Sequence, residues 1–299
     1  IQLKAHQLYG VAWFQHLYAR APSEVRGCLL ADDMGLGKTL QLLNVLGKIY
    51  EDEPDAPPSL ILVPKSLLQN WESEVEKFFM PSYPKHLVLY GDELVDRKQP
   101  RYRIDQELRT KGIADLLLPN WVGQNKLIIT TYDVLTAFEF SFAKQDFTFV
   151  VCDEAQRIKN PAANVSTAVR KLKAKFRVAC TGTPVENSLV DLWCLFDFFQ
   201  PGLLGSLEEF FKTYRKPIEC IGDEKRVDSL RLLQSLIRPQ TLRRTKMDIA
   251  ADLPKKYFAV SGTTLAERLL KPEIAHQELL RVGITDHQRV LYKGGLKRL

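Results

Sequence analysis

The sequence predicts an α/β fold, a RecA-like parallel sheet with helices on both faces, followed by a helical protrusion. Short β-branched or leucine-rich runs alternate with helical patterns over the first two hundred residues, and strands that alternate with helices form parallel sheets. Beyond about residue 200 the strand pattern stops and helical patterns dominate. Hydrophobic residues make up 45% of the 299 residues, which is ample for a buried core.

Five strands are expected, each followed by a helix. The pairs are residues 26–31 with 38–50, 59–64 with 66–79, 126–131 with 132–140, 147–154 with 162–173, and 176–183 with 188–199. In the helix at 66–79, Ser66 and Gln69 form a capping-box pair and apolar residues recur at three- and four-residue steps. Residues 51–59 are rich in proline and acid, so we expect a turn-rich surface connection. Residues 91–124 are expected to be a connection with a helix or two.

Composition favours an intracellular protein located in the cytoplasm. The five cysteines are far apart in sequence, which favours buried thiols in a reducing compartment. No apolar run is long enough to span a bilayer, and the N-terminal residues do not resemble a signal peptide. The chain does not begin with methionine, so we expect it to be part of a longer protein.

The charge is unevenly distributed. The net charge is −1 over residues 1–199 and +7 over residues 200–299. A basic excess suits contact with phosphate backbones, although a solvated helical surface is at least as consistent with charge alone.

A phosphate-binding loop is predicted within "ADDMGLGKTLQ", residues 31–41. It lies between an expected strand and an expected helix, the context that such a loop needs. Gly35 and Gly37 allow backbone N–H groups to approach phosphates, Lys38 reaches the β- and γ-phosphates, and Thr39 can ligate Mg²⁺. Asp32 stands where the usual pattern of a phosphate-binding loop, G-x-x-x-x-G-K-S/T, has its first glycine. The predicted nucleotide-binding residues in this loop are Asp33, Met34, Gly35, Leu36, Gly37, Lys38, Thr39 and Leu40.

An acidic pair ends the strand in "FVVCDEAQ", residues 149–156. We expect Asp153 to hold Mg²⁺ and Glu154 to orient and deprotonate the attacking water. An acidic pair after a strand is otherwise as often a helix N-cap. The phosphate-binding loop upstream favours catalysis.

These segments, in order, resemble the Swi/Snf-type remodelling ATPases of helicase superfamily two, particularly the bacterial branch. The resemblance rests on "DDMGLGKTLQ", "LILVPKSLLQNWESEVEKF", "CDEAQRIKNP", "TGTPVENSLVDLWCLFDFFQPGLLGS" and "LIRPQTLRRTKMDIAADLPKK". It covers nearly the whole chain and accounts for Asp32, because this family typically has Asp there. It implies a first RecA-like lobe at 1–199, a helical protrusion at 200–256, and a linker with the start of a second lobe at 257–299.

The resemblance also implies roles for individual residues. Gln7 would read the adenine edge, although an ordinary helix with a solvent-facing Gln is the alternative. Gln156 replaces the histidine that the family usually has, so we expect hydrolysis to survive with altered coupling. Thr181, Gly182 and Thr183 of "TGTP" would link the ATP state to DNA binding.

Several further residues are candidates for DNA contact: Lys65, Ser66, Thr130, Thr131, Arg243, Arg244 and Lys246. The hydroxyls that follow strands can instead cap the next helix. Arg243, Arg244 and Lys246 could brace the two lobes or belong to a solvated helix end.

The resemblance implies the ATP-binding lobe of a translocase that moves on double-stranded DNA and displaces bound proteins, with ATP and Mg²⁺ as cofactors. A strand-separating DNA or RNA helicase is an alternative, and an ATP-dependent protein docking module is another. In a bacterium the protein would be associated with the nucleoid. The second lobe's later motifs do not occur in the chain. We therefore expect these residues alone to bind Mg·ATP weakly, hydrolyse it very slowly and not translocate.

Overall fold

The computed structural model describes residues 2–79, 84–184, 188–220 and 225–249. All of them belong to one compact unit, Ile1–Asp252. The expected start of the second lobe at 257–299 lies outside the described residues, and so does the end of the expected protrusion.

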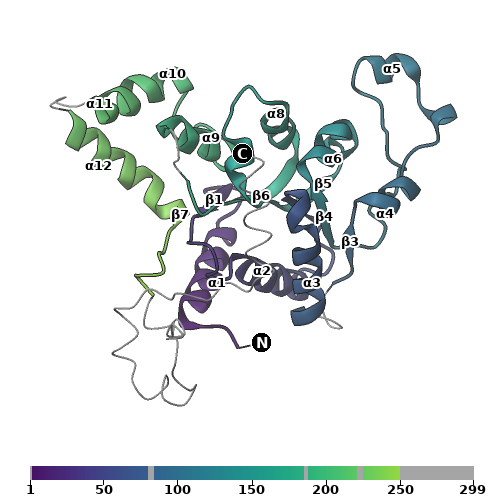
Figure 1. The fold of residues 1–299 in the computed structure, drawn as a ribbon, viewed down its shortest axis with the longest axis horizontal. Helices are drawn as coiled ribbons and strands as arrows, with labels where there is room; N and C mark the ends of the chain where they lie inside the picture. The colour runs from purple at the N-terminus through teal and green to yellow at the C-terminus, as the bar shows by residue number, and fades with distance from the viewer. Residues whose placement is uncertain (1, 80–83, 185–187, 221–224, 250–299) are drawn as a thin grey trace, which may run out of the picture. The chain divides into compact units, whose positions relative to one another are not determined.

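Among the described residues, seven parallel strands form one sheet. Figure 1 shows this sheet at the centre of the fold. Their order is β3-β4-β2-β5-β6-β1-β7, so β1 and β5 flank β6 near the middle. The predicted fold class is confirmed. The strands are β1 (Gly27–Leu30), β2 (Ser59–Val63), β3 (His86–Val88), β4 (Leu127–Thr131), β5 (Asp146–Cys152), β6 (Lys173–Cys180) and β7 (Thr241–Leu242).

Helices cover both faces of this sheet. Along β2, Leu60 and Leu62 pack with one set of helices, whereas Ile61 and Val63 pack with the other. This alternation follows from the two-residue period of a strand, and burial on both faces explains the continuous hydrophobic runs. The longer elements are α1 (Ala5–Tyr18), α2 (Lys38–Asp52), α3 (Leu68–Phe79), α8 (Asn164–Lys171), α9 (Leu189–Phe199) and α12 (Arg226–Ile237).

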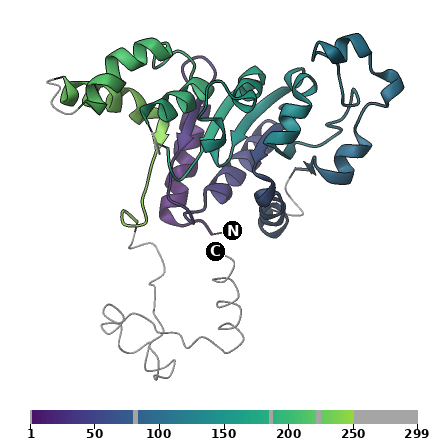
Figure 2. The ribbon, with the colours of Figure 1, turned by 45° about the horizontal axis from the view of Figure 1, so that its top comes forward.

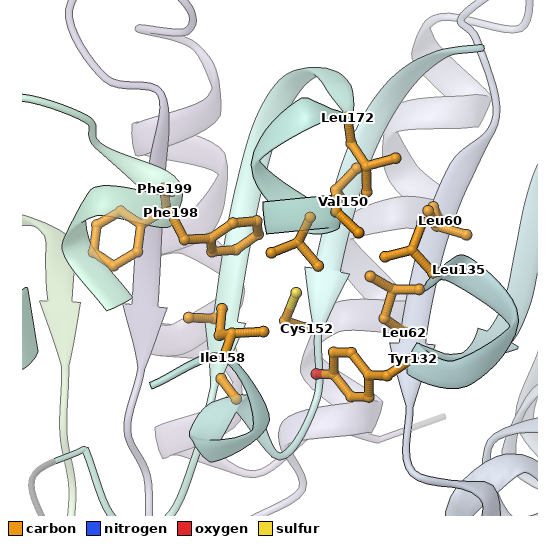
Figure 3. Packing of buried hydrophobic residues seen from close by; sticks show 14 of the residues in the cluster. Leu60, Leu62, Tyr132, Leu135, Val150, Cys152, Ile158, Leu172, Phe198 and Phe199 are labelled. Atoms are coloured by element: carbon orange, nitrogen blue, oxygen red, sulfur yellow. The ribbon is translucent and has the colours of Figure 1, made fainter. Parts of the chain in front are cut away.

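The two cores differ in their helices. One core contains residues of α1, α2 and α3, and the other contains residues of α6 (Tyr132–Ala137), α8 and α9. Figures 1 and 2 show these two groups on opposite sides of the sheet. In the second core, Tyr132 and Leu135 lie beside Val150 and Cys152 of β5 (Figure 3). The helices therefore fix the sheet from both sides and leave its carboxyl edge free for loops.

The remaining elements are short. They are α4 (Gly91–Asp96), α5 (Gln106–Thr110), α7 (Glu139–Ala143), α10 (Leu207–Phe210), α11 (Lys216–Glu219), the 3₁₀ turns Lys65–Leu67, Arg101–Arg103, Ala155–Ile158 and Arg238–Gln240, and the π-helical turn Phe211–Arg215. As expected, α4 and α5 lie within residues 91–124. Helices α10 to α12 follow β6, the last long strand of the sheet. No described helix is long and apolar enough to cross a bilayer.

Three sequence expectations need correction. Strands β3 and β7 were not expected, because each has only two or three residues and carries no alternating pattern of useful length. Ser66 does not cap a helix, because it lies inside a 3₁₀ turn and α3 begins at Leu68. Four cysteines are buried, as expected, but Cys220 is exposed.

Candidate functional site

The carboxyl edge of the sheet brings the predicted functional loops together. Leu30, at the end of β1, is in register with Cys180 at the end of β6, and Cys152 of β5 is in register with Ala179. The chain continues from these three strand ends into the phosphate-binding loop, the "TGTP" loop and the acidic pair. Burial raises the pKa of the Asp153 carboxyl, and the positive charge of nearby Lys38 is among the contributions that oppose this rise. The two residues therefore lie at the same edge.

The loop before α2 has the backbone geometry that its glycines predict. Gly35 and Gly37 have φ values of 85° and 78°, a backbone region that residues other than glycine rarely adopt. A Cβ atom on Gly37 would lie 2.4 Å from Nε2 of Gln7, whereas Gly35 faces open space. Helix α2 begins at Lys38, so its N-terminal N–H groups and dipole face the loop.

Lys38 and Gln7 both contact this loop. Nζ of Lys38 donates to the carbonyl oxygens of Asp32 at 2.8 Å and Asp33 at 3.4 Å. Gln7 is 8% exposed, and its Nε2 donates to the carbonyl oxygen of Leu36 at 3.4 Å. Gln7 is therefore packed against the loop, and the alternative of a solvent-facing Gln is wrong.

Asp153 is held from three directions. It is 8% exposed. Nε1 of Trp71 donates to its Oδ2 at 2.8 Å, and the backbone N–H of Glu154 donates to its Oδ1 at 3.0 Å. The hydroxyl of Tyr132 donates to its carbonyl oxygen at 2.7 Å. Burial raises the pKa of Asp153 above its ordinary value, and the Trp71 hydrogen bond opposes that rise.

Trp71 was expected only as one of the apolar residues that recur in the helix at 66–79, so its contact with Asp153 is a finding of the structure. The sequence carried one signal that could have found it. A buried Trp needs a hydrogen-bond acceptor for its indole N–H, and Trp71 is 2% exposed. Which acceptor it reaches depends on how α3 packs on the sheet.

Glu154 has an unusual backbone conformation. Its φ is 50°, the only positive value among the described residues other than glycine. Such a conformation costs about 1–3 kcal/mol and is concentrated at functional sites. Nε2 of Gln156 donates to Oε2 of Glu154 at 2.8 Å, which fixes the direction of the carboxylate.

Gln156 also connects the acidic pair to the "TGTP" loop. The hydroxyl of Thr181 donates to Oε1 of Gln156 at 3.2 Å, and the backbone N–H of Thr183 donates to that hydroxyl at 3.1 Å. Nζ of Lys159 donates to the carbonyl oxygen of Thr183 at 2.6 Å. These contacts form a continuous path from Glu154 to the loop that contains Gly182.

The donor set fits a hard divalent cation. Mg²⁺ prefers carboxylate, hydroxyl and water oxygens, and Asp153 and the half-buried Thr39 offer the first two. Each carboxylate oxygen of Asp153 accepts one N–H group. Because a carboxylate has about four lone-pair sites, it retains capacity for a cation or a water bound to one.

Two of the expected DNA contacts are wrong. Thr130 is fully buried and its hydroxyl donates to the carbonyl oxygen of Leu89 at 2.7 Å. Thr131 is 2% exposed and its hydroxyl accepts from the N–H of Val134 at 3.2 Å, which caps α6. The alternative, a hydroxyl that caps the next helix, is right for Thr131.

The basic cluster expected from Arg243, Arg244 and Lys246 divides in the structure. Arg244 is not an accessible phosphate contact, because its side chain is only 11% exposed and forms an ion pair with Asp32. Arg243 and Lys246 are exposed, as are Lys65 and Ser66. Nη1 of Arg243 lies 3.5 Å from the carbonyl oxygen of Gly182, which it faces as a donor. Four of the seven candidates therefore stay accessible.

Comparison with known proteins identifies relatives over most of the chain. A family model described as the SNF2-related domain matches residues 6–268. "Zorya protein ZorD" of Escherichia coli O139:H28 is 55% identical over 256 residues, which are 86% of this chain and 24% of that protein. The "putative ATP-dependent helicase/translocase YwqA" of Bacillus subtilis is 37% identical over 287 residues, 93% of this chain and 28% of that protein. The chain thus spans about a quarter of the length of these curated relatives.

A solved structure has the same fold. The Sulfolobus solfataricus SWI2/SNF2 ATPase core in complex with double-stranded DNA matches with a TM-score of 0.67 and 37% sequence identity. The match covers 85% of this chain and 47% of that one.

Proposed function

Because the chain belongs to the SNF2-related domain family, we propose that it is the first ATP-binding lobe of a translocase that moves along double-stranded DNA and displaces or remodels bound proteins. The observation that carries this proposal is the meeting of the Lys38 loop and the Asp153–Glu154 pair at one sheet edge. Nucleotides bind at this edge in open α/β sheets. The Bacillus subtilis relative named as a putative ATP-dependent helicase/translocase supports it.

The residues around the loop would bind the triphosphate. Gly35 and Gly37 let backbone N–H groups approach the phosphates, and Lys38 would exchange its contacts with Asp32 and Asp33 for phosphate oxygens. Gln7, already packed against the loop, would read the adenine edge. Thr39 and Asp153 would hold Mg²⁺, which neutralises charge on the phosphates when bound.

Glu154 would accept a proton from the attacking water. Gln156 holds this carboxylate through the 2.8 Å hydrogen bond and would orient it toward the nucleotide. Because Gln156 also contacts Thr181, movement of the "TGTP" loop would change the position of the base. Glutamine cannot become charged near neutral pH, unlike the histidine usual in the family.

Exposed basic and hydroxyl-bearing residues support the DNA part of the proposal. Lys65, Ser66, Arg243 and Lys246 are exposed and are the accessible candidates for phosphate contact. The similar archaeal ATPase core is named as a complex with double-stranded DNA. Weakening of DNA binding by added salt would check that these contacts reach phosphates.

Glu154→Gln tests the catalytic assignment. In the full-length protein that contains this chain, we expect Mg·ATP binding to remain while DNA-stimulated hydrolysis falls about a hundredfold or more, because the general base is lost. Glu208→Gln is the matched control, since Glu208 is exposed on α10, far along the chain from the site. Full hydrolysis by Glu154→Gln would contradict the assignment.

Two experiments separate the alternatives. Stimulation of ATP hydrolysis by blunt duplex DNA without strand displacement favours a translocase, whereas displacement of one strand indicates a strand-separating helicase. If Glu154→Gln retains biological function together with partner binding, the lobe is an ATP-dependent docking module. Loss of function in that variant supports the motor.

A further inference from the structure

Arg244 follows β7 in the chain and reaches three elements that surround the phosphate-binding loop. Its Nε donates to Oδ1 of Asp32 at 3.0 Å, and its Nη2 donates to Oε1 of Gln41 at 2.8 Å. Shorter contacts join Nη2 to Oδ2 of Asp32 and Nη1 to the carbonyl oxygen of His6. One guanidinium therefore links α1, the loop entrance and α2.

Backbone hydrogen bonds strengthen the same attachment. The N–H of Arg244 donates to Oδ1 of Asp32 at 3.1 Å, and the N–H of Asp33 donates to the carbonyl oxygen of Arg244 at 3.0 Å. The N–H of Lys246 donates to Oδ2 of Asp33 at 3.0 Å. The segment after β7 is thus bound along the entrance of the loop.

Two partners of Arg244 also hold the back of the loop. Nε2 of Gln41 donates to the carbonyl oxygen of Gly37 at 3.2 Å, and a ring nitrogen of His6 lies 3.2 Å from the carbonyl oxygen of Leu36. In a trans peptide the N–H points away from the carbonyl of the same plane. Holding these two carbonyls therefore turns the N–H groups of Gly37 and Lys38 to the opposite side, where phosphate would bind.

The ion pair explains the acid at the loop entrance. Asp32 has 0% side-chain exposure and Arg244 has 11%. A glycine at position 32 would leave this largely covered guanidinium without a counter-charge. Buried ion pairs add little stability over apolar residues of similar volume. We therefore expect this pair to affect the position of the loop more than the stability of the fold.

We propose that Arg244 is a positioning residue for ATP binding, and that the Asp32–Arg244 pair makes the phosphate-binding loop depend on docking of the segment after β7. This inference rests on the proposed function, because it concerns the same nucleotide site. Arg244 would act on the loop through residues that contact the loop, such as Gln41 and His6, and would not itself touch ATP.

Gly10→Ala tests the contact between Gln41 and Arg244 without altering any charge. A Cβ atom on Gly10 of α1 would lie 1.9 Å from Oε1 of Gln41 and 3.2 Å from Nη2 of Arg244, so the Gln41 amide must move away. Alanine has a higher helix propensity than glycine, so α1 should remain folded. We expect Mg·ATP affinity to fall about tenfold, because the loop is less preorganised.

Arg244→Lys is the second variant, because it keeps the charge and removes the forked geometry that contacts Asp32 and Gln41 at once. Arg231→Met is the control, since Arg231 is exposed on α12. Affinity is measured on the full-length protein by titration with a fluorescent ATP analogue and Mg²⁺. Amide hydrogen exchange of residues 31–41 without nucleotide should be faster in both variants and unchanged in the control. Circular dichroism establishes that each variant is folded.

The two variants also form a cycle. If both act through the Gln41–Arg244 contact, the Gly10→Ala/Arg244→Lys double variant should lose no more affinity than the weaker-binding single variant. Additive losses would overturn the shared mechanism. Unchanged ATP affinity in folded Gly10→Ala and Arg244→Lys would overturn the inference while leaving the proposed function intact. Failure of the unmodified protein to bind ATP would instead remove the proposed function.

Discussion

At the scale of single residues, the hydrogen bonds around Asp153 fix the orientation of its carboxylate. Trp71 donates to one oxygen and the Glu154 N–H donates to the other. With both oxygens occupied, the carboxylate has one orientation at the sheet edge. Such fixed geometry would suit the metal-binding role that we propose for Asp153, because the surrounding residues orient a carboxylate that binds a metal.

Trp71→Phe should loosen this orientation. Phenylalanine keeps a buried ring but has no N–H, so Oδ2 of Asp153 loses its donor, and we expect a loss of about 1–3 kcal/mol in unfolding free energy. The concentration of Mn²⁺ needed for half-saturation, followed by electron paramagnetic resonance with ATP present, should rise several-fold.

Trp193→Phe is the control for this change. Nε1 of Trp193 donates to the carbonyl oxygen of Gly205 at 3.1 Å, so the same substitution removes a comparable hydrogen bond elsewhere. An equal shift in metal binding for both variants would show that Trp71 has only a structural role.

At the scale of elements, the connection between β3 and β4 is anchored to α7. Asp115 accepts hydrogen bonds from Ser141 at 2.6 Å and Lys144 at 2.8 Å. The hydroxyl of Ser141 in turn accepts from the N–H groups of Leu116 and Leu117. Helices α4 and α5 are short and lie beyond the β3 edge of the sheet (Figure 1). We infer that this polar contact fixes where the connection rejoins the core.

Asp115→Asn should therefore weaken folding in a pH-dependent way. Burial raises the pKa of Asp115, but the Lys144 and Ser141 hydrogen bonds outweigh it, so the net pKa is lowered. A lowered folded-state pKa gives stability that is present above the ordinary value near 3.8 and is lost as the pH falls through the folded pKa.

Urea unfolding at pH 7 and near pH 3.5 measures this effect. We expect Asp115→Asn to cost about 1 kcal/mol at pH 7, and the difference from the unmodified protein to shrink at the lower pH. Glu107→Gln is a control, because its pair with Lys111 is exposed. A difference that stays constant with pH would argue against a charged Asp115.

At the scale of the whole molecule, the sheet presents its functional loops on one edge. The resemblance to superfamily-two ATPases implies that the nucleotide would lie between this lobe and a second one, which would supply arginines to the γ-phosphate. An arginine finger contributes about 10³–10⁵ in rate in nucleotide hydrolases. The described residues supply the phosphate-binding loop and the acidic pair, and their Arg244 is committed to Asp32.

The isolated chain should consequently be a poor ATPase. We expect it to bind Mg·ATP weakly and to hydrolyse ATP roughly a thousandfold more slowly than the full-length protein with duplex DNA. Phosphate release, measured with and without DNA, checks the rate. DNA-stimulated turnover by the chain at the full-length rate would contradict the need for a second lobe.

The sequence by itself determined the fold class and the two central loops. Buried parallel strands require continuous apolar runs, so β1, β2, β4, β5 and β6 were predictable from composition along the chain. The glycines around Lys38 and the acids after β5 were predictable because their chemistry depends on residue type and local spacing. Strands β3 and β7 were not, since pairing with a neighbour defines such short strands.

Only the tertiary structure decided which groups meet across the chain. The Asp32–Arg244 pair joins residues 212 positions apart, and the Trp71–Asp153 hydrogen bond joins residues 82 apart. Local sequence patterns specify helices and strands, because these depend on neighbours along the chain. Long-range partners depend on how helices pack on the sheet. Arg244 was expected to contact DNA, brace the two lobes or face solvent, and its side chain is instead largely covered beside the loop and paired with Asp32.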